Sequence, residues 1–187
     1  MIRPRLRRGF RRDASGVSAV EFALVLPVLA LILVGVLELG TILYQRFELD
    51  GAMAAGANYA LVNAADVSSE NGANLATRIA AVINARAGAM WADSDVDVNN
   101  GARLVVETGL PAPSGTIANA DACYCPTGTA QNLTWGAAQT CGSPCASGGM
   151  AGKFVRISLS RNYTPLFAGY GIVDDGTISV ATMVQTQ

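Results

Sequence analysis

The sequence predicts an α+β protein in which one long amino-terminal helix carries a small head. Three observations predict this class: a long apolar run near the amino terminus, a second segment of helical periodicity, and short β-rich segments toward the carboxyl end. A chain of 187 residues has room for one ordinary domain and an appendage. We therefore expect a basic leader at residues 1–16, a transmembrane helix with its extension at 17–65, and a head at 66–187.

The leader is strongly basic. It holds six of the thirteen Lys and Arg residues of the chain: Arg3, Arg5, Arg7, Arg8, Arg11 and Arg12. Residues 1–16 carry a net charge of +5 and residues 17–187 carry −6, so the total of −1 is a cancellation. Because residues 17–187 carry a net negative charge, we expect no nucleic-acid partner.

The apolar run is long enough to cross a membrane. No charge occurs from Phe22 to Leu37, and only Glu38 interrupts the run before Tyr44. A spanning helix needs about 20 residues. The arginines before the run and the acids after it predict a cytoplasmic amino end and an external head. A cleaved secretory signal is the alternative, but the nearest small-residue stretch, 51–55, lies well past the end of the run.

The junction before this run has the sequence Gly-Val-Ser-Ala-Val-Glu-Phe at residues 16–22. A carboxylate near the membrane interior, such as that of Glu21, costs about 2.5–3.5 kcal/mol on insertion scales. Cleavage after Gly16 would create a cationic amino group on Val17. That group can pair with Glu21 of the same or a neighbouring subunit and so neutralise both charges.

This junction resembles the type IV prepilin signal in its Tad-pilus form, in which a glycine is followed by four residues, a glutamate and an aromatic residue, here Phe22. The resemblance implies that a prepilin peptidase cleaves between Gly16 and Val17 on the cytoplasmic side and that the helix is retained. Pro27 fits the resemblance, since such helices often carry a proline there. The alternative is an unprocessed bitopic anchor of a periplasmic structural or adhesion protein, in which Glu21 only marks the interface.

Beyond Tyr44 the sequence is rich in alanine and lacks proline, so we expect the helix to continue to about Ala65. A helix over 17–65 would be roughly 73 Å long. Residues 66–74 form a polar break. Apolar residues then recur at helical spacing and predict a second, amphipathic helix that ends near Ala87: Leu75, Ile79, Val82 and Ile83.

Three segments predict the strands of a short antiparallel sheet: residues 103–108, 154–162 and 177–184. We expect Pro111, Pro113 and Gly115 to end the first of them. The last part of the chain, with Asn-Tyr-Thr-Pro-Leu-Phe at 162–167, a glycine-rich turn and a final alternating strand, resembles the close of TadE-like proteins.

TadE-like proteins are minor pilins or pseudopilins of the tight-adherence (Tad, Flp-type) pilus. The resemblance implies a pilin-like fold, insertion in the inner membrane with the head in the periplasm, and a part in assembling an adhesive pilus. Its implied partners are the prepilin peptidase and other Tad pilins, namely TadF-like, TadG-like and Flp major pilins. TadF-like and TadG-like proteins share the amino-terminal pattern, so these related roles stay open.

All four cysteines lie in one loop, residues 123–145: Cys123, Cys125, Cys141 and Cys145. Disulfides persist outside the cytoplasm, so we expect two bridges. Three connectivities are open. Crossing the two pairs would close loops of roughly 15–20 residues, each worth on the order of 3 kcal/mol. Zinc is disfavoured because the Cys-x-Cys spacing is tighter than a zinc knuckle.

The chain has no histidine, which excludes Ser-His-Asp triads, Cys-His pairs and histidine-ligated zinc. We expect a protein that is not an enzyme and that needs no cofactor or metal. Residues 93–101 look like a calcium loop, but Val98 stands where glycine is required and Leu104 where glutamate is required. We expect a solvated acidic strand edge or turn there instead.

Overall fold

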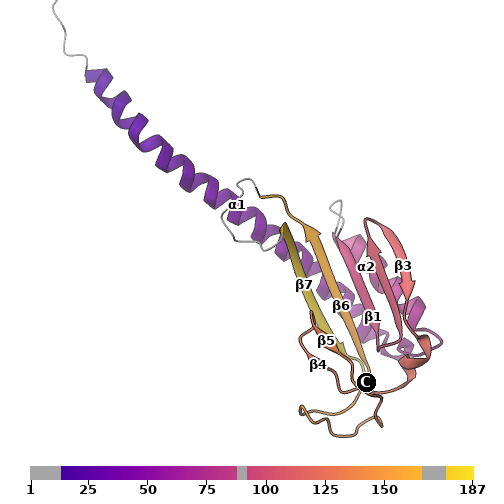
Figure 1. The fold of residues 1–187 in the computed structure, drawn as a ribbon. Coiled ribbons are helices and arrows are strands. Elements are labelled where there is room, and N and C mark those ends of the chain that lie inside the picture. The colour runs from indigo at the N-terminus through magenta and orange to yellow at the C-terminus, as the bar shows by residue number, and fades with distance from the viewer. Residues whose placement is uncertain (1–13, 88–91, 166–175) are drawn as a thin grey trace, which may run out of the picture. The chain divides into compact units, whose positions relative to one another are not determined.

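The structure is a computed structural model that describes residues 14–87, 92–165 and 176–187. The chain forms two compact units, Met1–Thr41 and Ile42–Gln187. Helix α1 (Ala14–Val62) contributes to both units (Figure 1). The long amino-terminal apolar helix, the second helix and the antiparallel sheet confirm the predicted α+β, pilin-like class.

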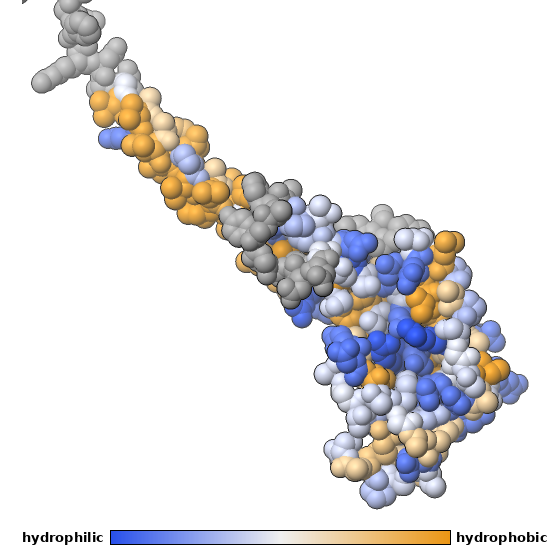
Figure 2. Space-filling model, viewed as in Figure 1, coloured by the Kyte–Doolittle hydropathy of each residue, from blue (hydrophilic) through white to orange (hydrophobic). Residues whose placement is uncertain are grey.

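In the first unit, α1 is apolar on all sides and continues through Pro27 without interruption. Most of its apolar side chains are exposed, with Leu24 73% exposed and Leu33 58% exposed, whereas Glu38 is buried. The segment is almost uniformly hydrophobic in Figure 2. A helix with apolar residues all round needs an apolar environment on every side.

Helix α1 ends at Val62, a few residues before the expected Ala65, and a 3₁₀ turn (Ala64–Asp66) follows it. Helix α2 spans Gly72–Ala87. Of the four apolar positions that predict it, Leu75, Ile79 and Ile83 are fully buried, whereas Val82 is only partly buried.

The main sheet of the described residues has five antiparallel strands in the order β3-β2-β1-β6-β7. Their bounds are Asp93–Val98 for β1, Ala102–Glu107 for β2, Leu110–Ser114 for β3, Phe154–Asn162 for β6 and Thr177–Gln185 for β7. Two short strands, β4 (Thr127–Gly128) and β5 (Leu133–Thr134), form a separate hairpin in the long loop between β3 and β6.

Strand β1 was not predicted, although it is the middle strand of the sheet. Its aspartates, Asp93, Asp95 and Asp97, alternate with buried residues that include Val96 and Val98. The aspartates therefore share the outer face of the sheet while the valines reach the core. Of the expected alternatives, a solvated acidic strand edge or a turn, the segment is a strand, but it lies in the middle of the sheet and a turn follows it.

The prediction that Pro111, Pro113 and Gly115 end the β2 segment was wrong. A turn at Thr108 and Gly109, both with positive φ, ends β2, and the chain returns as β3. Pro111 pairs with Val106 and Pro113 with Leu104. Proline is tolerated here because β3 is an edge strand, so the missing N–H groups cost no ladder hydrogen bond.

The core of the second unit lies between the inner face of the sheet and two helices, α2 and residues 42–62 of α1 (Figure 1). Leu49 of α1 and Ile157 of β6 are fully buried in it. Gly56 permits close packing, because a Cβ there would lie 2.9 Å from Cγ1 of Ile83. The outer face of the sheet carries the polar residues, and the long loop lies against it.

Candidate functional site

The first candidate site is the amino-terminal segment of α1 that holds Gly16, Val17, Glu21 and Phe22. All four residues are helical. Val17 and Phe22 are each 60% exposed, and a Cβ at Gly16 would meet no atom within 4 Å. Nothing described in the chain packs against the bond between Gly16 and Val17. The roles of these residues in processing and assembly stay predictions.

Glu21 is the one charged residue between Ala14 and Leu37. Its helical neighbours Leu24 and Val25 are 73% and 60% exposed. Among the ion pairs of the described residues, none includes Glu21. An isolated carboxylate on an apolar surface favours a cationic partner from outside the described structure.

The same helix is a candidate membrane anchor. Across the described ranges, it is the one helix long and apolar enough to span a bilayer, with a mean hydropathy of 2.7 over its most apolar 18 residues and none of that window buried. Its apolar side chains therefore have no protein core to enter within their own unit.

The second candidate region is the cysteine loop. Cys123 bonds to Cys141 and Cys125 to Cys145, with sequence separations of 18 and 20. The expectation of two bridges is confirmed, and of the three open connectivities the structure has the crossed one. Cys123 is fully buried, so the first bridge anchors the loop in the head.

A network of charges covers the outer face of the sheet. Asp95 accepts two hydrogen bonds from Arg103, at 2.8 and 2.9 Å, and a third from Arg156 at 2.9 Å. Burial alone would raise the pKa of Asp95, but the hydrogen bonds from the two guanidinium groups outweigh it and the pKa is lowered. Asp95 therefore neutralises charge from both neighbouring strands.

Beside this network, the long loop and the sheet border an open pocket of about 550 Å³, which we term the loop pocket. Strands β1, β2 and β6 form its floor. One wall includes the chain around the 3₁₀ helix η2 (Ile117–Asp121), and the other is the β4-β5 hairpin with Trp135. The lining residues are Asp97, Asn100, Gly101, Arg103, Gly115, Thr116, Asn119, Gln131, Asn132, Leu133, Trp135 and Arg156.

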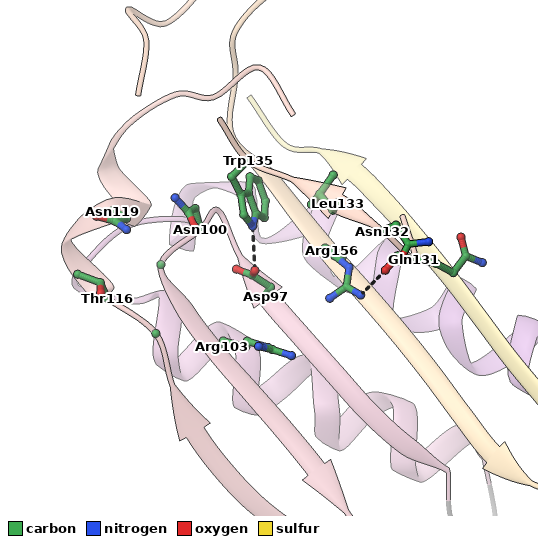
Figure 3. A pocket seen from close by; sticks show the side chains of 12 residues that line it. Asp97, Asn100, Arg103, Thr116, Asn119, Gln131, Asn132, Leu133, Trp135 and Arg156 are labelled. Atoms are coloured by element: carbon green, nitrogen blue, oxygen red, sulfur yellow. Dashed lines mark hydrogen bonds between the residues drawn. The ribbon is translucent and has the colours of Figure 1, made fainter. Parts of the chain in front are cut away.

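The hairpin wall is fixed to the floor by hydrogen bonds. Nε of Arg156 donates to the carbonyl oxygen of Ala130 at 2.6 Å, and Nε1 of Trp135 donates to Oδ2 of Asp97 at 3.0 Å. Figure 3 shows Trp135 over Asp97, with Asn119 further to the left in this view and Gln131 and Asn132 to the right. Burial raises the pKa of Asp97, although the hydrogen bond from Trp135 opposes the change.

The opposite wall is held by Asn99, which is fully buried and has a positive φ of 54° in the turn after β1. Its amide donates to the carbonyl oxygens of Ala120 and Ala122 and accepts from the N–H of Phe154. One side chain thus joins the β1-β2 turn, the end of η2 and the start of β6. Asparagine suits this place because it tolerates left-handed backbone.

No group of three or more Cys, Asp or Glu within the described ranges is placed to hold a metal. Asp93, Asp95 and Asp97 share a strand face, but Asp95 is occupied by two arginines.

The described residues thus combine a candidate membrane anchor with a disulfide-stapled α+β head of the pilin-like class. Residues 16–58 match the sequence model of the TadE family, described as TadE-like protein. The predicted resemblance to TadE-like proteins is confirmed for this segment. The match begins at Gly16 and includes neither the sheet nor the loop pocket.

No curated protein and no solved structure matched the chain. The loop pocket was not predicted from the sequence. Its walls depend on contacts between residues far apart in the chain, and the strongest available signal was the alternation of aspartate and valine in β1.

Proposed function

We propose that the protein is a TadE-like minor pilin that takes part in assembling Tad-type adhesive pili from the inner membrane. One observation carries the proposal: the TadE-like match begins at Gly16, where an exposed apolar helix also presents Glu21 without an ion-pair partner among the described residues. The role is structural rather than catalytic.

In this proposal a prepilin peptidase cuts between Gly16 and Val17 and removes residues 1–16 with their net charge of +5. The new amino group of Val17 pairs with Glu21, in the same subunit or a neighbouring one. Because both charges are then neutralised, the helix can enter an apolar bundle at lower cost. Phe22 and the apolar residues after it supply the packing surface.

The proposed partners are the prepilin peptidase and other Tad pilins: TadF-like, TadG-like and Flp major pilins. The proposed orientation places the arginines in the cytoplasm and the head, 66–187, in the periplasm. Two supports are the positive-inside rule and the two disulfides, which persist in an oxidising compartment.

Pilus formation by a Glu21→Ala variant tests this role. In parent cells that lack the wild-type gene, we expect normal expression and membrane insertion of the variant but few or no pili by electron microscopy. Glu70→Ala, which removes an exposed glutamate from the head, is the matched control and should restore pili. Normal piliation with Glu21→Ala would refute the role of Glu21 in assembly.

A further inference from the structure

We propose that the loop pocket binds a neutral saccharide. This inference goes beyond the proposed role in pilus assembly and does not rest on it, because that role depends on the amino-terminal segment of α1. The pocket has a volume of about 550 Å³, which lies in the range of small-molecule sites and fits a mono- or disaccharide.

The first observation is a set of side-chain amides with no internal partner. Asn119 lies on one wall of the pocket and Gln131 and Asn132 on the other. Among the hydrogen bonds of the described residues, none uses these three side chains. Arg156 does bond Gln131, but through the backbone oxygen and not through the side-chain amide. An amide both donates and accepts, as a sugar hydroxyl does. The walls therefore complement a ligand rich in hydroxyl groups.

The second observation is the balance of charge. Arg103 and Arg156 both bond to Asp95, and Asp97 lies beside them in the floor of the pocket. Two guanidinium groups thus face two carboxylates. An anion would be repelled by Asp97 and a cation by the arginines, so the floor favours a ligand without net charge.

The third observation is a fixed aromatic ring. Nε1 of Trp135 bonds to Asp97, and its ring meets Tyr124 edge-on with centroids 5.7 Å apart. The indole is therefore held in place while it lines the pocket. Its apolar surface suits the C–H face of a pyranose ring. Because the ring is already fixed, little side-chain entropy is lost on binding.

The test uses the full chain in phospholipid nanodiscs, since an alkyl glycoside detergent would itself offer a sugar to the pocket. The probes are glucose, galactose, mannose, N-acetylglucosamine and their disaccharides, with phosphate and sialic acid as anionic comparisons. Saturation-transfer NMR identifies a bound sugar, and calorimetry measures its affinity. We expect saturable binding of at least one neutral sugar and weaker or no binding of the anions.

Variants on both walls locate the site. Asn119→Ala and Gln131→Ala should each weaken binding about three- to tenfold, the effect of losing one hydrogen bond. Asn162→Ala removes an exposed amide at the end of β6, outside the pocket, and should leave the affinity unchanged. Circular dichroism of each variant checks that the fold is kept.

Three results would overturn the proposal: no saturable binding of any neutral sugar up to about 10 mM, tighter binding of phosphate or sialic acid, or equal affinity in the wall variants and the wild type. Pilus formation in the same variants separates this proposal from the assembly role. A chain that binds no sugar but still supports pili would refute the saccharide site alone.

Discussion

The two compact units use the same apolar residue types in opposite ways. In the first unit Leu24 is 73% exposed and Val36 is 62% exposed, whereas in the second unit Leu49 and Ile157 are fully buried. The head has a buried apolar core of its own. The amino-terminal helix leaves its apolar residues exposed, as the proposed role of a membrane anchor that packs against other subunits requires.

Two glutamates of α1 show the same contrast in charge. Glu48 pairs with Arg161 of β6 at 3.1 Å, inside the second unit. Glu21 has no ion pair among the described residues. A carboxylate that is satisfied within its own unit serves stability, whereas one that needs an outside cation can serve recognition.

The largest expected effect on the head comes from Asn99→Ala. It removes the side-chain hydrogen bonds to Ala120, Ala122 and Phe154 and places alanine at a positive φ. We expect the free energy of unfolding to fall by about 3–5 kcal/mol. The Tm should fall by about 10 °C, measured by thermal unfolding of the full chain. A decrease below about 3 °C would contradict the joining role of Asn99. Asn162→Ala is the exposed control.

A smaller effect is expected from Glu48→Gln. The substitution removes the negative charge of Glu48 that faces the guanidinium of Arg161, whose side chain is 4% exposed, while Glu48 itself is 31% exposed. We expect the head to lose about 2 kcal/mol of stability, measured by denaturant unfolding. Piliation should persist if the variant folds. Loss of pili from a folded Glu48→Gln protein would contradict the assignment of stability to Glu48 and of recognition to Glu21.

The smallest effect is a difference in pH dependence between two carboxylates of β1. The pKa of Asp97 is raised by burial, so its contribution to stability falls as pH rises from about 3.9 through the folded-state value. The pKa of Asp95 is lowered by its arginines, which outweigh burial, so its contribution is present above about 3.9 and lost as pH falls.

Denaturant unfolding between about pH 3 and pH 7 measures this difference. Asp97→Asn should be as stable as the wild type in acid and more stable than the wild type at neutral pH, because it removes the buried charge while the amide oxygen still accepts from Trp135. Asp95→Asn should show the opposite sign and be less stable at neutral pH. The same sign for both substitutions would contradict the electrostatics of the outer face.

Local patterns predicted most of the fold. The apolar run gave α1, helical spacing gave α2, and alternation gave β2, β6 and β7. The two missed strands of the main sheet lacked such signals, because Asp93, Asp95 and Asp97 made β1 look solvated and Pro111 and Pro113 argued against β3. In the folded head neither the aspartates nor the prolines are unfavourable. Asp95 pairs with two arginines on the outer face, and β3 tolerates proline because it is an edge strand.

The loop pocket could not be predicted from the sequence for a different reason. Its walls are fixed because the side chains of Arg156 and Asn99 donate to backbone oxygens of the loop. Every residue has a backbone oxygen, so the sequence does not indicate which ones act as acceptors. The junction at residues 16–22 is a local motif, so the sequence alone could indicate it, and the family match to residues 16–58 starts at the same glycine.

The proposed pilin role depends most directly on the mature amino terminus. Mass spectrometry of the protein purified from membranes of its parent cells measures it. We predict a chain that begins at Val17, and an uncleaved chain in cells that lack the prepilin peptidase. A protein that keeps residues 1–16 in wild-type cells, or that begins near Ala55, would contradict the proposal; retention of the leader would favour an unprocessed membrane-anchored protein.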